Sequence, residues 1–169
     1  VMIVLGLTMG MQPIVGYNFG AQKIDRVKQT LRLGIISGVV ITSSGFVICE
    51  FFPHAVSALF TDSDELINLA VEGIRLAVLM FPFVGAQIVI GNFFQSIGKA
   101  KISIFLSLTR QLLYLLPCLL LFPQWWGLKG VWISMPVSDA LAFVTAVISL
   151  MIYIKKVSKE HPIANKVAE

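Results

Sequence analysis

Long runs of apolar residues, separated by short polar segments, dominate the pattern along the 169-residue chain. Each run carries few charged positions and reaches about 20 residues, the length that an α-helix needs to cross the hydrocarbon core of a bilayer. The pattern predicts an all-α, polytopic membrane helix bundle with about five transmembrane helices and a polar tail at 155–169. The predicted helices are roughly 1–21, 33–52, 66–97, 102–122 and 130–154.

The composition supports a membrane protein. Hydrophobic residues make up 57% of the chain and charged residues only 13%, against about 25% charged residues in soluble domains. The cysteines and histidines lack metal-ligand spacing, and no hydrolase triad, P-loop or zinc motif is present. We therefore expect no enzyme activity, catalytic residue, metal site, cofactor or nucleic-acid partner. Because the chain enters apolar sequence directly at Val1, without a secretory signal, we also expect a fragment of a longer protein.

The charged residues predict an orientation in the membrane. The positive-inside rule places basic connections in the cytoplasm, so 22–32, 98–101 and the C-terminus are predicted to face the cytoplasm. The basic connection 22–32 can also be interpreted as a lipid head-group site, but a topogenic role is simpler. The basic residues are Lys23, Arg26, Lys28, Arg32, Lys99, Lys101, Lys155, Lys156, Lys159 and Lys166, and the residues expected on the outer side include Asp62, Asp64, Glu65, Glu72, Trp125, Trp126 and Trp132.

Prolines and small residues inside the predicted helices indicate kinks and close packing. The kink candidates are Pro13, Pro82, Pro117 and Pro136. Proline is ordinarily frequent in transmembrane helices, so functional hinges and static kinks both remain open. Three G-x-x-x-G pairs, a pattern that permits close helix approach, fit either a reorganising or a static bundle. These pairs are Gly6 and Gly10, Gly16 and Gly20, and Gly34 and Gly38.

Polar residues inside the predicted span 66–97 form a stripe. Gln87, Gly91 and Gln95 are spaced i, i+4 and i+8, with Asn92 alongside. Such residues face a bundle interior or a cavity rather than lipid. Neutral amides bind cations and aromatic drugs weakly and without a charge cost, which favours cavity lining over interhelical hydrogen bonds alone. Tyr17 is a further candidate for the bundle interior or the cytoplasmic mouth of a cavity.

Two ionisable residues, Arg110 and Asp139, fall well inside predicted spans. Arg110 lies about 12 Å from the cytoplasmic start of its helix at 1.5 Å per residue, and Asp139 lies similarly deep from the outer side. Their helices are neighbours in sequence, so we expect an Arg110–Asp139 ion pair. Three interpretations stay open: Asp139 is a protonatable coupling site, Arg110 is a gate, or the two form a fixed structural pair. An aspartate held at full charge by arginine is a poor proton carrier, which favours the structural interpretation.

Several segments resemble MATE (multidrug and toxic compound extrusion) transporters, most of all the MepA-like bacterial branch. The segments are "GMQPIVGYNFGAQKIDRVKQTLRLG", "FFQSIGKAKISIFLSLTRQLLYLLPCLLL" and "GLKGVWISMPVSDALAFV". The resemblance implies a parent of twelve helices in two six-helix lobes, in which 1–154 forms part of the C-terminal lobe. It also implies export of cationic or amphiphilic drugs by sodium or proton antiport with alternating access, in a lipid bilayer and together with the missing N-terminal lobe.

One feature departs from the family pattern. Some members place a coupling carboxylate in the helix that corresponds to 66–97. Here the membrane-spanning part of that helix has no Asp or Glu, and its polar side chains with hydrogen-bonding capacity are the amides Gln87, Asn92 and Gln95. Coupling carboxylates are then expected in the missing part of the parent or at Asp139. Two alternatives to the drug–cation antiporter also stay open. One is a lipid-linked oligosaccharide flippase, which would need a large cationic cavity that Arg110 alone does not provide. The other is a membrane subunit that acts through helix–helix contacts without transport.

Overall fold

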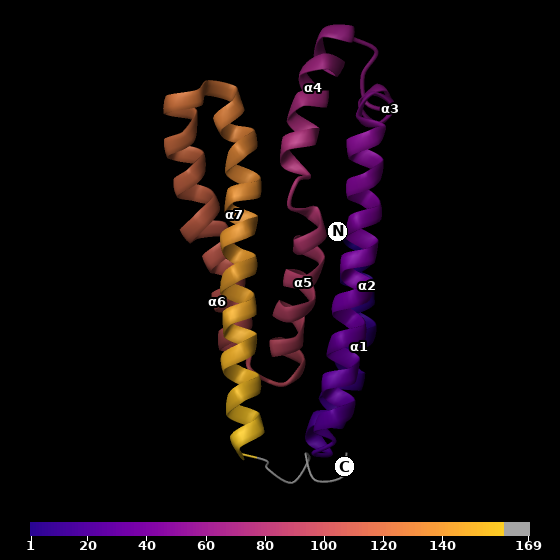
Figure 1. The fold of residues 1–169 in the computed structure, drawn as a ribbon, viewed down its shortest axis with the longest axis vertical. Coiled ribbons are helices and arrows are strands. Elements are labelled where there is room, and N and C mark those ends of the chain that lie inside the picture. The colour runs from indigo at the N-terminus through magenta and orange to yellow at the C-terminus, as the bar shows by residue number, and fades with distance from the viewer. Residues whose placement is uncertain (161–169) are drawn as a thin grey trace.

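The chain is a bundle of long helices in a computed structural model that describes the backbone of residues 1–160 (Figure 1). Residues 161–169, with the predicted cytoplasmic Lys166, lie outside the described residues, as does the side chain of Lys159. The elements are α1 (Met2–Gly20), α2 (Ile24–Phe51), α3 (Pro53–Ala58), α4 (Asp64–Ala77), α5 (Phe81–Ser96), α6 (Ala100–Leu108), the π-helix η1 (Thr109–Leu115) and α7 (Leu116–Glu160).

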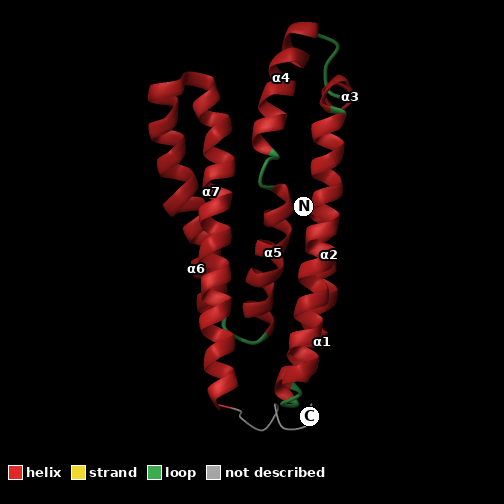
Figure 2. Cartoon of the chain, viewed as in Figure 1, coloured by secondary structure: helices red, strands yellow, loops and turns green. Residues whose placement is uncertain are grey.

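The predicted all-α membrane bundle is confirmed over this part of the chain (Figure 2). Three helical segments are long and apolar enough to cross a membrane: Met2–Gly20, Ile24–Phe51 and Ala100–Val157. A fourth is added when the bent pair of α4 and α5 counts as one span. The segment Ala100–Val157 folds back at Gly127 into two antiparallel arms (Figure 1). These arms, α1, α2 and the bent pair correspond to the five predicted passes.

The observed helix bounds differ from the predicted ones for local reasons. α2 begins at Ile24 rather than 33, because the basic stretch continues the helix as an amphipathic extension with Val27 and Leu31 buried. The predicted helix 66–97 is two helices bent by 53°. Proline lacks an N–H and disfavours helical geometry in the residue before it, so α5 restarts with Pro82 in its first turn.

The predicted connection between 122 and 130 is instead a tight reversal. Helix continues to Gly127, whose φ of 54° and ψ of −134° are accessible essentially only to glycine. Gly130 closes the reversal, because a Cβ there would collide with the backbone of Phe122. The first arm also contains η1, which the sequence pattern did not predict.

The four prolines proposed as kinks occupy different places. Pro82 begins α5 at the 53° bend, and Pro117 lies in the first turn of α7, directly after η1. Pro13 lies inside α1 and Pro136 inside α7, without non-helical backbone beside either. A hinge function for any of them stays a prediction.

Helix α5 forms the centre of the bundle and packs against α1, α2, α6 and α7. Its residues Val89, Ile90, Phe93 and Phe94 are all nearly inaccessible and join one apolar core with side chains of α1, α2 and α7. Small residues allow the backbones to approach at the contact between α2 and α5, as G-x-x-x-G pairs do in membranes. A Cβ on Gly38 would lie 3.0 Å from the Gly85 carbonyl oxygen, and one on Gly34 would lie 3.2 Å from Val89 Cγ1 of α5 and 2.7 Å from Met11 Sδ of α1.

The other two glycine pairs do not pack in this way. A Cβ on Gly6, Gly10 or Gly20 would meet no atom within 4 Å, and one on Gly16 would meet the Ser96 carbonyl oxygen at 3.3 Å. Among the three pairs, the closest contacts therefore belong to the pair on α2.

Candidate functional site

A polar groove lies between α5 on one side and α6 and η1 on the other. It has a volume of about 310 Å³, and Leu5 of α1 also lines it. Its remaining lining residues are Gln87, Ile88, Gly91, Asn92, Gln95, Ser103, Leu106, Ser107, Arg110 and Gln111. Most of these side chains are polar, in a bundle whose outer surface is otherwise rich in exposed apolar side chains.

All three amides of the predicted stripe line this groove. Gln87 is buried, and its Oε1 has no hydrogen-bond partner among the described residues. Asn92 donates from Nδ2 to the Ile88 carbonyl oxygen of its own helix at 2.9 Å, and Gln95 is exposed to the groove. A buried amide oxygen without a donor is unusual in a protein interior. Its acceptor capacity is therefore unused among the described residues.

The opposite wall contains residues that the sequence analysis missed. Ser103, Ser107 and Gln111 lie on α6 and η1 and face the amide stripe across the groove. Their spacing is i, i+4 and i+8, the same as that of Gln87, Gly91 and Gln95. This repeated spacing on two consecutive helices was the signal that would have identified the second wall.

Arg110 and Asp139 form the ion pair expected from the sequence. Arg110 Nε donates to Asp139 Oδ1 at 2.9 Å, linking η1 to α7. The Asp139 side chain is 9% exposed, whereas that of Arg110 is 36% exposed, and only Arg110 is among the groove-lining residues. The groove therefore meets the guanidinium, while the carboxylate lies behind it. Whether the pair serves coupling or structure stays a prediction.

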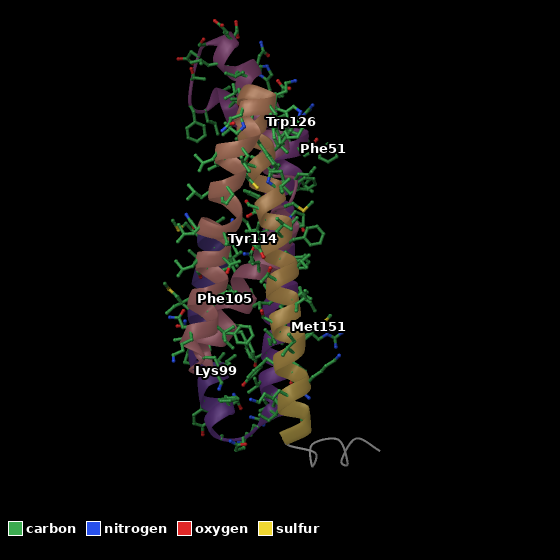
Figure 3. All side chains as sticks on the ribbon, turned by 90° about the vertical axis from the view of Figure 1, so that its left-hand side faces the viewer. Phe51, Lys99, Phe105, Tyr114, Trp126 and Met151 are labelled. Carbon is green, nitrogen blue, oxygen red and sulfur yellow. The ribbon has the colours of Figure 1, made fainter. Side chains whose placement is uncertain are left out.

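The π-helical geometry surrounds Arg110, which is the second residue of η1. π-Helical turns are rare and occur frequently at functional sites. A second polar contact joins the same two elements, between Tyr114 Oη and Thr145 Oγ1 at 2.8 Å. In Figure 3, Tyr114 lies midway along this pair of helices. Together the two contacts fix η1 against α7 behind the groove.

The structure does not bring Tyr17 to this groove. Its side chain is 74% exposed on α1, and it is absent from the described lining of the groove. A role for Tyr17 in a larger cavity stays a prediction.

Charges separate along the bundle as the sequence pattern indicated. The α1–α2 turn, the α5–α6 turn and the last turns of α7 lie at one end of the bundle (Figure 1). They carry most of the basic residues, whereas α4, at the other end, begins with Asp64 and Glu65. Here Lys129 Nζ lies 2.6 Å from Glu72 Oε1 and Arg75 Nε lies 3.9 Å from Glu50 Oε1. These pairs join α7 to α4 and α4 to α2 at the acidic end.

The fold and the groove define a class of protein, the polytopic membrane helix bundle with a polar interior site. The chain belongs to the MatE family, whose model matches residues 1–120. The predicted family resemblance is therefore confirmed.

Relatives with assigned names support this family. The chain is 24% identical over 157 residues to the multidrug export protein MepA of Staphylococcus aureus (strain MSSA476), covering 90% of this chain and 33% of the relative. It is 23% identical over 143 residues to the FAD transporter of Shewanella oneidensis, covering 82% of this chain and 31% of that one. The chain spans about a third of the length of these relatives.

Solved structures share the fold. The MATE multidrug transporter DinF-BH, in complex with R6G, is 37% identical with a TM-score of 0.83, over 88% of this chain and 33% of that one. An inward-facing MATE family transporter is 19% identical with a TM-score of 0.86, over 92% of this chain and 37% of that one. At this lower identity the likeness concerns the fold alone.

Proposed function

We propose that the chain is part of the C-terminal lobe of a twelve-helix secondary transporter that exports cationic or amphiphilic drugs. The observation that carries the proposal is the polar groove inside a MatE-family bundle, with facing amide and hydroxyl stripes. Ligand sites of this kind combine an apolar surround with a few placed polar groups. Support also comes from relatives named as a multidrug export protein and a MATE multidrug transporter.

The proposed transport is driven by sodium or proton antiport, with no other cofactor and no enzymatic step. In the described part of the groove lining there is no carboxylate, so this wall does not supply an obvious coupling group. The proposed location is a bacterial inner membrane, with residues 22–32, 98–101 and the C-terminus in the cytoplasm. The clustering of basic turns at one end of the bundle supports this orientation.

The arrangement of charge disfavours the flippase alternative. A pyrophosphate head group calls for a strongly cationic cavity, whereas Arg110 is the single charged residue in the described groove lining and is paired with Asp139. The proposed function therefore remains drug export. A transport assay without any transport would favour the other alternative, a membrane subunit that does not transport.

Transport of dye into everted vesicles that contain the full-length transporter tests this proposal, because export from the cytoplasmic face of an everted membrane delivers the dye to the vesicle lumen. We expect extrusion of a cationic dye that depends on an ion gradient. Loss of extrusion on removal of the sodium gradient, with persistence under a proton uncoupler, would assign sodium, and the reverse result would assign protons. Absence of extrusion under both gradients would overturn the drug–cation antiporter. Because one relative is named an FAD transporter, flavin adenine dinucleotide is the second substrate to measure in the same vesicles.

Changing Gln95 to leucine is expected to raise the apparent KM for the dye by about two- to tenfold, the effect of losing one hydrogen bond of about 0.5–1.5 kcal/mol. Gln95 lines the groove and is exposed to it, so we expect the substitution to leave the packing of the core unchanged. The matched control is Gln124→Leu, since Gln124 is an exposed amide on α7 outside the groove. Equal KM values for the two variants would remove Gln95 from the substrate path.

A further inference from the structure

A second hollow lies at the basic end of the bundle. It has a volume of about 710 Å³, between the α1–α2 turn, the start of α6 and the last turns of α7. Three lysines from two separate helical regions line it: Lys99, Lys101 and Lys156. Figure 3 shows Lys99 near this end of the bundle and Trp126 at the opposite end. The hollow shares no lining residue with the polar groove, so it is a separate site.

The charges of this hollow favour an anion. Its described lining contains no carboxylate, and among the described residues neither Lys99 nor Lys101 forms an ion pair. Helix α6 starts at Ala100, directly between these two lysines. The positive end of its dipole adds to their charge at this point. A phosphate group is the kind of anion that lysine ammonium groups and a helix N-terminus bind together.

Apolar side chains form the rest of the hollow. Phe105 is 56% exposed and Ile152 is 64% exposed, and both line it together with Phe19, Ile102 and Tyr153. In Figure 3, Phe105 of α6 lies above Lys99, away from the basic end. Exposed apolar side chains continue in that direction, at Leu108 on α6 and Ile148 on α7. A free phosphate ion would make no favourable contact with these apolar side chains. A phospholipid has both a charged head group for the lysines and hydrocarbon chains for the apolar side chains.

We infer that this hollow binds one anionic phospholipid from the leaflet at the basic end of the bundle. The phosphate lies among Lys99, Lys101 and Lys156, and an acyl chain lies along Phe105 and Ile152. Basic pockets between membrane helices on the cytoplasmic side bind phosphorylated head groups in this way. The sequence alone favoured a topogenic role for basic connections, because it did not show lysines of α6 and α7 converging on one hollow. The inference concerns lipid and does not depend on what the transporter exports.

Lipid titration of the full-length protein in detergent, followed by native mass spectrometry, tests this site. The probes are dioleoyl phosphatidylglycerol and, as the neutral lipid, dioleoyl phosphatidylcholine. We expect one phosphatidylglycerol molecule to be retained in preference to phosphatidylcholine. Each lysine near an anionic head group contributes about fivefold to binding, so Lys99→Gln, Lys101→Gln and Lys156→Gln together should weaken it by about a hundredfold. The corresponding triple substitution to arginine should preserve binding.

The matched control removes the same positive charge from elsewhere at this end. Arg26→Gln, Lys28→Gln and Arg32→Gln alter residues of α2 that do not line the hollow, and we expect them to leave phosphatidylglycerol retention nearly unchanged. Equal losses in the two glutamine variants would overturn the site in favour of diffuse charge attraction. Displacement of the lipid by excess inorganic phosphate would overturn the assignment of a lipid site and indicate a site for small anions instead. Failure of wild-type protein to prefer phosphatidylglycerol would overturn both.

Discussion

Replacing Gly85 by alanine is expected to destabilise the bundle by about 2–3 kcal/mol, the upper part of the range for overpacked cores. A Cβ on Gly85 would lie 2.5 Å from Thr42 Oγ1 and 2.7 Å from the Gly38 carbonyl carbon, and it would also overlap the Gly38 carbonyl oxygen. Backbone atoms cannot turn away as a flexible side chain does. The helices α2 and α5 must therefore separate at the contact that holds the centre of the bundle.

The measurement is the thermal unfolding midpoint of the full-length protein in detergent, with Gly45→Ala as the matched control. Gly45 lies in α2, and a Cβ there would meet no atom within 4 Å. Alanine favours a helix over glycine by about 1 kcal/mol, so the control should keep or raise the midpoint while Gly85→Ala lowers it. A rise in both variants would mean that α2 and α5 do not pack in this register.

The close contact at Gly85 illustrates what the sequence can and cannot predict. The Gly34–Gly38 spacing marks one helix face as suited to close approach, but the partner is a single glycine, Gly85, without a G-x-x-x-G spacing of its own. The register between α2 and α5 depends on how Thr42, Val89 and their neighbours fit together. This fit is tertiary information that hydrophobic periodicity does not contain.

The breaks within the predicted spans also separate features that the sequence pattern can predict from features that depend on tertiary contacts. Proline at the first turn of α5 was visible as Pro82, but the sequence pattern continued through it and predicted a single helix. η1 has no comparable sequence signal, because a π-helical turn follows from how Arg110 and Tyr114 meet α7. The fold class and the charge separation were therefore accessible from the sequence, since they depend on composition and period. Pro82 also marked the position of the bend, although the angle of 53° was not predictable. The π-helical segment was not accessible, since it depends on tertiary contacts.

One wall of the groove, formed by α5, could be predicted from the sequence, and the opposite wall, formed by α6 and η1, was missed. Gln87, Asn92 and Gln95 were identified because amides are conspicuous in an apolar helix. Ser103 and Ser107 were overlooked because hydroxyl groups can bond to the carbonyl oxygens of their own helix and are less conspicuous there. Tyr17 was a further candidate, and the structure leaves it exposed on α1 and outside this groove. Spacing shared between consecutive helices is thus a better guide to a groove wall than the polarity of single residues.

Replacing Asp139 by alanine is expected to destabilise the protein by about 2 kcal/mol, because the Arg110 guanidinium loses its carboxylate inside the bundle. Breaking a fully buried pair costs about 3–5 kcal/mol, and the partial exposure of Arg110 to the groove reduces this figure. The double variant Arg110→Ala with Asp139→Ala should recover most of the loss, since removing both charges of a buried pair is often nearly neutral. Unfolding midpoints of the two single variants and the double variant give the coupling energy.

A matched control for the ion pair is Glu72→Ala, which breaks the exposed pair with Lys129. Its side chains are 47% and 64% exposed, so the expected cost is at most about 1 kcal/mol. If Glu72→Ala lowered the stability as much as Asp139→Ala does, the loss of any ion pair would explain the destabilisation. The burial of the Arg110–Asp139 pair would then not be its cause. An additive double variant at Arg110 and Asp139 would contradict the structural pair even if both single variants are unstable.

Transport by Asp139→Asn separates structure from coupling, because asparagine keeps the shape and one acceptor oxygen for Arg110 but not the charge. For a structural pair we expect dye efflux that keeps its gradient dependence, at a rate lowered in proportion to the amount of folded protein. For a coupling residue the protein would fold and bind dye, yet gradient-driven efflux would be lost. The position of the carboxylate behind Arg110, out of the groove and held at 2.9 Å, favours the first result. Folded protein without gradient-driven efflux would therefore reverse the assignment and make Asp139 the coupling site.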